Sequence, residues 1–211
     1  MTDEEVAPAN CALATVAAGW EAAEVQPFEN VLIQGAGALG FYAAALARHY
    51  GCKRIIVTDK LDHRLEFIKA FGASDIFNVS RMSDENLIEA VRDLTGGFGV
   101  DCVMEVAGAA GLIPLGLKCL RTGGRFVEIG NSSPGANFTY DACDIVWRRL
   151  TLKGVHNYDA KHLQAAVDFL EATRATFPFN NIVTHRVNLN RINDGLRVAD
   201  SGQAIRVALL P

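Results

Sequence analysis

Clusters of lysine and arginine are missing from this sequence, whose 24 acidic residues outnumber its 20 basic ones. The formal net charge is −4. Proteins that bind nucleic acids usually present a basic face that neutralises phosphates. We therefore expect no nucleic-acid partner.

Long hydrophobic runs are missing too. No segment approaches the length of about 20 apolar residues that spans a bilayer. The N-terminal segment, MTDEEVAPAN, is acidic, whereas a secretory signal starts with basic residues and continues with an apolar run. We expect no membrane attachment and a cytoplasmic location.

Paired cysteines are also missing. The sequence has five cysteines, each isolated from the others, and no C-x-x-C pair: Cys11, Cys52, Cys102, Cys119 and Cys143. An odd, dispersed set is typical of a reducing compartment. We expect neither a disulfide framework nor a structural zinc cluster.

What the sequence does contain is a glycine-rich segment between two apolar runs. Asn30–Asp59 reads NVLIQGAGALGFYAAALARHYGCKRIIVTD, which predicts a strand, a tight turn, a helix and a second strand. Gly35 would allow the turn, Gly37 would let a pyrophosphate approach the backbone, and Gly40 would let the helix pack closely on the strand. The phosphates would bind the free N–H groups at the start of the helix.

The position of Asp59 supports a dinucleotide site. The pattern G-x-G-x-x-G alone occurs by chance in many sequences, but here an acidic residue ends the next strand, where a carboxylate binds the adenosine ribose. That carboxylate favours NAD over NADP, because it would repel the extra phosphate of NADP. Lys60 and Arg64 would offset part of the repulsion. The alternative is that Asp59 is a solvated acid at a strand end.

Strands alternate with helices along most of the chain. We expect helices at 9–23, 60–71, 83–94 and 159–173, another ending near 120, and strands at 31–33, 54–58, 75–79, 100–107, 125–129, 150–155, 182–189 and 204–210. This order predicts an α/β fold with a doubly wound parallel sheet, the Rossmann arrangement. Ligands bind beyond the carboxyl ends of such strands, which places Gly35–Gly40, Asp59, Val106–Gly108 and Ile129–Ser132 on one rim.

Two further side chains lie near this rim. Glu105 falls inside an apolar strand, where an unpaired carboxylate would be costly, so we expect it to have a partner and a structural role. His156 follows the strand expected at 150–155 and could touch a substrate. His49 and His162 fall on predicted helices and are interpreted as structural or solvated.

The chain resembles the cofactor half of the medium-chain dehydrogenases, the zinc-containing alcohol, polyol and threonine dehydrogenases. The resemblance runs nearly end to end. It depends on NCALATVAAGW near the start, GAGALG with Asp59, the pair VMEVAG and GGRFVEIG, and the terminal SGQAIRVALLP.

The resemblance implies an NAD site. The positions that it assigns to the cofactor are Thr15, Gly35, Gly37, Ala38, Leu39, Gly40, Asp59, Arg64, Val106, Ile129 and Arg206. In similar enzymes Thr15 would face the nicotinamide, the backbone at Ile129 would hold the carboxamide, and Arg64 would lie near the ribose. Arg206 would reach the phosphates, although it could equally be an ordinary charge on an edge strand.

Cys11 lies where similar enzymes place one of three protein ligands of the catalytic zinc, which acts as a Lewis acid on the alcohol. The alternative is a small buried apolar residue. One cysteine is not a metal site, so we expect zinc only in a full-length enzyme and not in this chain alone.

The family's leading GroES-like domain, which supplies the other zinc ligands and much of the substrate pocket, has no counterpart in this sequence. We expect residues 1–25 to be a linking helix, 26–180 the dinucleotide-binding domain, and 181–211 a segment returning toward the catalytic domain. Either the chain is part of a longer dehydrogenase, or it is a naturally short chain that has lost the catalytic part.

Our first hypothesis is the NAD-binding domain of a zinc-dependent alcohol dehydrogenase-like enzyme, inactive as this chain alone, which transfers hydride between an alcohol or polyol and NAD. Our second is a non-catalytic NAD(H)-binding or interaction module. A zinc-independent reductase of the same superfamily usually favours NADP, and Asp59 counts against it. Similar enzymes associate through edge strands of this domain, which Asn137–Tyr140 and Leu150–Val155 would supply, so we expect a homodimer or homotetramer.

Overall fold

The computed structural model describes residues 1–211, and its centre is a six-stranded sheet in the order β3-β2-β1-β4-β5-β6. Every neighbouring pair of strands in this sheet is parallel. The strands are β1 (Asn30–Gln34), β2 (Arg54–Asp59), β3 (Asp75–Asn78), β4 (Val100–Glu105), β5 (Leu120–Glu128) and β6 (Thr151–Gly154). The strand order reverses between β1 and β4, which is where doubly wound sheets bind ligands. The fold class expected from the sequence is confirmed.

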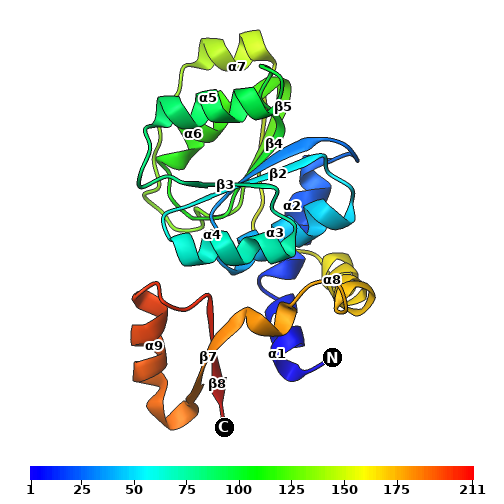
Figure 1. Ribbon diagram of the computed structural model, residues 1–211, viewed down its shortest axis with the longest axis vertical. Coiled ribbons are helices and arrows are strands. Elements are labelled where there is room, and N and C mark those ends of the chain that lie inside the picture. Colours follow the sequence, from blue (N-terminus) through cyan, green and yellow to red (C-terminus); the bar gives the residue numbers. More distant parts are fainter.

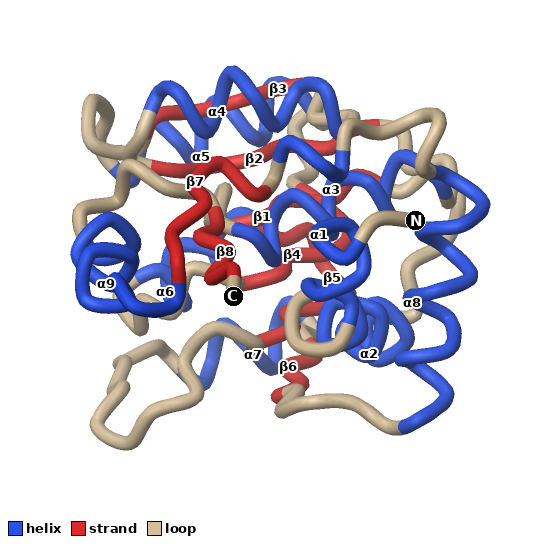
Figure 2. Tube along the Cα trace, turned by 90° about the horizontal axis from the view of Figure 1, so that it is seen from below, coloured by secondary structure: helices blue, strands red, loops and turns tan.

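Helices cover both faces of the sheet (Figure 1). One face carries α2 (Leu13–Ala23), α3 (Ala38–His49), α4 (Asp62–Ile68) and α8 (Ala160–Thr173), and the other carries α5 (Asp84–Leu94), α6 (Leu112–Cys119) and α7 (Ala142–Arg148). Figure 2 shows the strands stacked edge to edge between these helices. None of the helices is long and apolar enough to cross a membrane.

Alternate residues of each strand pack into two separate cores. Ile33 and Met104 belong to the core under α2, α3 and α8, while Leu32 and Val103 belong to the core under α5 and α6. Because successive side chains of a strand point to opposite faces, a parallel strand covered on both sides is apolar at every position. This explains the continuous apolar runs of the sequence.

The C-terminal residues form a second, two-stranded parallel sheet, β7 (Val183–Asn188) with β8 (Arg206–Leu210), joined by α9 (Ile192–Asp200). This sheet lies below the large one in Figure 1, beside the short N-terminal helix α1 (Asp3–Val6). Short 3₁₀ turns complete the chain at Ala7–Ala9, Lys69–Phe71, Phe179–Asn181 and Leu189–Arg191.

Several expected boundaries were wrong. The first long helix begins at Leu13 instead of residue 9, because Pro8 lies in a separate 3₁₀ turn. Strand β5 begins at Leu120, since this residue already pairs with Val100 before the register shifts. Asn137–Tyr140 is not a strand. The Tyr140 hydroxyl donates instead to the Asp144 carboxylate of α7, a helix that the sequence patterns did not predict.

Candidate functional site

The glycine turn lies at the carboxyl end of β1, and its three glycines have different surroundings. Gly35 adopts a φ of +114°, which side chains other than glycine's disfavour, and its N–H donates to Thr58 O at 2.8 Å. A Cβ on Gly40 would lie 2.0 Å from Gly35 O, whereas a Cβ on Gly37 would meet no atom within 4 Å. The structure therefore packs the helix against the turn at Gly40 and leaves open space beside Gly37.

Helix α3 begins immediately after Gly37, and no side chain caps its N-terminus. Its first residues, Ala38 and Leu39, are half-buried. The unpaired N–H groups of a first helical turn and the helix dipole favour an anion. The open space beside Gly37 and this uncapped turn together fit a pyrophosphate.

Asp59 ends β2 next to this turn, and its carboxylate is engaged with the backbone on both sides. Oδ2 accepts a hydrogen bond from Ala36 N at 2.7 Å, and Oδ1 accepts one from Leu61 N at 2.9 Å. Each carboxylate oxygen has a second lone pair for a ligand hydroxyl. The link to Ala36, which the sequence did not predict, means that Asp59 also shapes the turn.

The two predicted arginines differ in their surroundings. The Nη2 of Arg64 donates to Gly202 O at 3.0 Å and to Ala204 O at 2.7 Å, so this guanidinium ties α4 to the loop between α9 and β8. The guanidinium of Arg206 has no hydrogen-bond or ion-pair partner and lines a cleft with Asp3 and Glu4. Of the two, Arg206 is the one available to an incoming anion.

A second cleft, of about 270 Å³, opens at the carboxyl ends of β4 and β5. Residues from distant parts of the sequence line it together: Cys11, which was assigned to the zinc, and Thr15, Leu39, Val106 and Ile129, which were assigned to the cofactor. The Thr15 hydroxyl donates to Cys11 O at 2.6 Å, which fixes its orientation on the wall of the cleft. His156 lines the same cleft, as expected from its place after β6.

Cys11 is exposed and free. No group of three or more His, Cys, Asp or Glu side chains in the structure could hold a metal ion. A catalytic zinc needs three protein ligands, so the residues of this chain do not fit zinc by themselves.

Beneath the cleft lined by Thr15 and Ile129 lies an acidic pair, one residue buried and one half-buried, that only half matches expectation. Glu105 is fully buried and has partners, as expected: its Oε1 accepts hydrogen bonds from Ala107 N and Gly108 N, both at 2.9 Å. Its neighbour in β5 is a second carboxylate, Glu128. The Asn131 side chain donates to both. Burial first, and then Glu128, raise the pKa of Glu105 to about 7.

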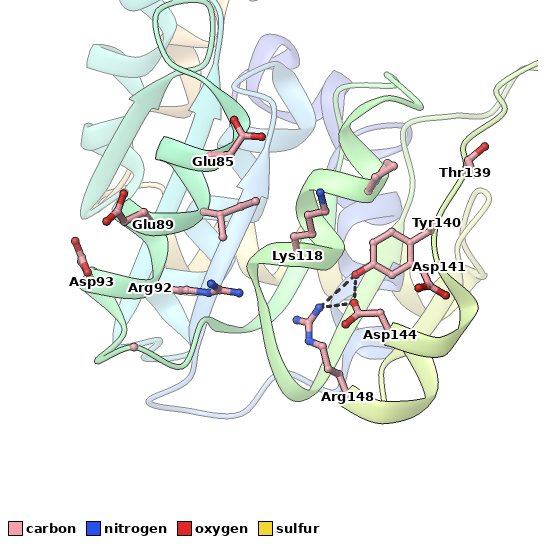
Figure 3. A pocket seen from close by; sticks show the side chains of 13 residues that line it. Glu85, Glu89, Arg92, Asp93, Lys118, Thr139, Tyr140, Asp141, Asp144 and Arg148 are labelled. Atoms are coloured by element: carbon pink, nitrogen blue, oxygen red, sulfur yellow. Dashed lines mark hydrogen bonds and ion pairs between the residues drawn. The ribbon is translucent and has the colours of Figure 1, made fainter.

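The largest cleft lies away from the rim, among α5, α6 and α7, and has a volume of about 1100 Å³ (Figure 3). Arg148 pairs with Asp144 and reaches the Tyr140 hydroxyl, while the guanidinium of Arg92 and the amine of Lys118 have no partner. Acidic residues outnumber basic ones on its lining: Glu85, Glu89, Asp93, Asp141 and Asp144 against Arg92, Lys118 and Arg148. It therefore does not fit a phosphate-rich ligand.

Known proteins resemble this chain over most of its length. Residues 38–172 match the family model described as zinc-binding dehydrogenase. L-threonine 3-dehydrogenase of Colwellia psychrerythraea is 29% identical over 181 residues, which are 86% of this chain and 51% of that enzyme. The chain thus spans about half the length of the relatives that it matches.

Solved structures share the fold over the whole chain. The alcohol dehydrogenase of Thermotoga maritima superposes with a TM-score of 0.93 at 27% identity and covers 100% of this chain, which corresponds to 59% of that structure. A Sinorhizobium meliloti protein bound to NADP superposes with a TM-score of 0.85 at 24% identity, over 95% of this chain and 58% of that one. The second likeness shows the fold alone.

Proposed function

The chain belongs to the zinc-binding dehydrogenase family, and from this we propose that it binds NAD as the cofactor-binding half of an alcohol or polyol dehydrogenase. The observation that carries the proposal is the open, uncapped turn at Gly37 with Asp59 beside it. One relative is a threonine dehydrogenase and one structural neighbour an alcohol dehydrogenase. Both names fit a small hydroxyl-bearing substrate.

The proposed roles of the residues follow the length of the cofactor. The N–H groups that open α3 would bind the pyrophosphate, with Arg206 as a counter-charge, and the second lone pairs of Asp59 would accept from the ribose hydroxyls. The cleft lined by Thr15, Val106 and Ile129 would hold the nicotinamide and exclude water from one of its faces. When bound, the nicotinamide supplies the hydride acceptor, and the chain supplies its orientation.

NAD is the proposed form in preference to NADP. A phosphate charge about 4 Å from the Asp59 carboxylate would cost roughly 4 kcal/mol at an effective dielectric constant near 20. Arg64 keeps its charge, but its Nη2 donates to the carbonyl groups of Gly202 and Ala204 and is not free to bond that phosphate. The preference therefore depends on Asp59.

A specific observation keeps a second function open, a non-catalytic NAD(H)-binding or interaction module. Cys11 is the only residue implied as a zinc ligand, and no metal-binding cluster surrounds it. Zinc-dependent hydride transfer by this chain would need further metal ligands beside Cys11. In either case the cofactor site would be the same.

The remaining proposals concern assembly and location. Strand β6 is the edge of the large sheet, and Leu152 on it is 39% exposed. An open edge pairs readily with another strand, so we place a homodimer contact at β6, with a homotetramer as the larger form. A cytoplasmic location stays a prediction.

Titration of the 211-residue chain with NADH, followed by nicotinamide fluorescence, tests the proposal. We expect saturable binding that NAD displaces at lower concentration than NADP. No binding by the wild-type chain, with a folded circular dichroism spectrum, would contradict it. Elemental analysis of protein purified without chelators then separates the two functions: about one zinc per chain, lost in Cys11→Ala, supports the enzyme, and no zinc supports the binding module.

A further inference from the structure

The carboxyl groups of Glu105 and Glu128 face each other at the ends of β4 and β5. These residues are register partners, and their side chains lie within hydrogen-bonding reach of each other. Glu105 is 0% exposed. Glu128 is half-buried. Two carboxylates so close, one of them fully buried, cannot both be ionised without a large free-energy cost, so the pair needs a hydrogen atom, a cation or a donor for each oxygen.

Protein donors satisfy three of the four oxygens. Glu105 Oε1 accepts from the N–H groups of Ala107, Gly108 and Ala109, and its Oε2 accepts from Asn131 Nδ2 at 3.3 Å. Glu128 Oε1 accepts from Asn131 N and Nδ2, both at 2.9 Å. Glu128 Oε2 is buried and has no donor. One hydrogen atom is therefore missing from the pair.

No cation supplies it. The strands that flank the pair place Gln34 of β1 opposite Glu105 and Gly154 of β6 opposite Glu128, and neither is charged. His156, beyond β6, lines the cleft with Glu128, and its Nε2 lies 3.2 Å from Asn157 Nδ2.

Other elements also pack against β5 and β6. Their charged groups pair with residues outside the Glu105–Glu128 pair or line a different cleft. On α2 and β6, Glu21 pairs with Lys161 and His162, and Glu24 pairs with Lys153. On α6 and α7 they are Lys118, Asp144 and Arg148, which line the cleft of Figure 3.

We infer that Glu105 and Glu128 share one proton in the folded protein, and that this proton-sharing pair positions the two loops that hold the nicotinamide end of the cofactor. The proton lies between the two carboxyl groups and completes the bond that Glu128 Oε2 lacks. The proton is a property of the two neighbouring carboxyl groups as a pair and not of either residue alone. The positioning role rests on the proposed function, whereas the shared proton does not.

The two loops interlock directly above the pair. A Cβ on Gly130 would lie 2.3 Å from Gly108 N and 2.4 Å from Glu105 Oε2, so loop 106–109 and loop 129–131 touch through their backbones. Glu105 holds the first loop by its N–H groups, and Glu128 holds the second through Asn131. Loss of the shared proton would leave two adjacent negative charges, one buried and one half-buried, that push these loops apart. Val106 and Ile129, on the wall of the nicotinamide cleft, would move with them.

The raised pKa of Glu105, about 7, agrees with this geometry, because burial and the neighbouring carboxylate both disfavour the second negative charge. The first test needs no cofactor. In ¹³C-labelled protein we expect one glutamate carboxyl resonance to titrate near pH 7. It should be absent from Glu105→Gln, and it should move to lower pH in Glu128→Gln, which removes the neighbouring charge but not the burial. It should be unchanged in Glu171→Gln, a matched change at an exposed glutamate. A wild-type spectrum without it, or its persistence at the same pH in both variants, would overturn the shared proton.

The second test addresses positioning. NADH is the probe, because its reduced ring carries no charge that the carboxylates would attract. Between pH 6 and pH 8.5 we expect the Kd of NADH to rise several-fold in the wild-type chain and to change less in Glu128→Gln, whose amide keeps a donor toward Glu105 at every pH. Equal pH profiles would overturn the positioning role. If NADH fails to bind at any pH while the carboxyl resonance still titrates near 7, the proposed function fails and the shared proton stands.

Discussion

The Asp59 carboxylate accepts a hydrogen bond from Ala36 N across the mouth of the glycine turn, at 2.7 Å. This contact joins the ends of β1 and β2, where the cofactor's ribose and pyrophosphate would meet. The residue that would recognise the ribose therefore also holds the loop that would bind the phosphates. The two roles can be measured separately. A change of the Asp59 side chain would alter the stability of the cofactor-free protein through the loop contact, and the affinity for the cofactor through the ribose contact.

Asp59→Asn should lower both quantities. The amide has one oxygen where the carboxylate has two, so it cannot accept from Ala36 N and Leu61 N at once. An unmatched buried N–H costs about 1–3 kcal/mol, and we expect that loss in urea unfolding together with weaker NADH binding. Asp200→Asn, at an exposed site without a partner, should change neither. Unchanged stability in Asp59→Asn would show that the contacts to Ala36 and Leu61 are not important.

Two alanine substitutions in the turn should differ strongly in their cost to folding. Gly37→Ala meets no atom within 4 Å, so it should cost less than about 1 kcal/mol. Its methyl group would still occupy the space left for the pyrophosphate and abolish NADH binding. Gly40→Ala would place a Cβ 2.0 Å from Gly35 O and should cost about 3 kcal/mol or more. Retained NADH affinity in a folded Gly37→Ala would contradict the phosphate site.

Stability should depend on pH through Glu105. Its pKa is about 7 in the folded chain against an ordinary value of 4.5, so between these values the folded state binds more protons than the unfolded state. The free energy of unfolding should therefore fall by about 3 kcal/mol as pH rises from 4.5 to 7, and level off above. Chemical denaturation across this range should show a smaller fall in Glu128→Gln. Parallel curves would contradict the assignment.

The start of α8 is stabilised by a histidine whose ring accepts one hydrogen bond and donates another. His162 Nδ1 accepts from Asp159 N at 2.9 Å, which places the hydrogen on Nε2, 3.1 Å from Glu21 Oε2. His162→Ala should cost about 1–2 kcal/mol, because it removes the capping bond and leaves a gap. His162→Gln should recover part of that loss, since glutamine at the third helical position can bond the same N–H. Equal melting temperatures for the two variants would argue against the cap.

The edge strand provides a test of assembly. Light scattering of the wild-type chain should give the mass of a dimer or tetramer, and Leu152→Arg should shift it toward the monomer by placing a charge on the exposed edge of β6. Leu196→Arg, on α9 and 60% exposed, serves as the control. A monomeric wild-type mass would exclude the proposed contact.

Local chemistry explains which parts of this protein could be predicted. The glycine turn and the alternation of strands with helices follow from residue types at fixed spacing, whereas the place of Thr15 beside Val106 and Ile129 was expected from the family resemblance. Helix α7 was missed because Val146 and Trp147 are 71% and 78% exposed, so no buried face marks it in the sequence.

Contacts set by tertiary structure could not be predicted in the same way. Glu128 was missed because its meeting with Glu105 depends on the register of strands joined by a long crossover. The attachment of Arg64 to Gly202 and Ala204 spans 138 residues or more and has no signature in the local pattern. Arg64, the basic residue expected near the ribose, therefore bonds two backbone carbonyl groups instead.

The alternation of side chains between the two cores has a consequence for energetic coupling. Val103 and Met104 are adjacent in the chain, but the sheet separates the groups that they touch. Cavities made at these two positions would share no wall, so their costs should add, as they do for distant sites. In this sheet, distance along the backbone is a poor guide to which residues compensate for one another.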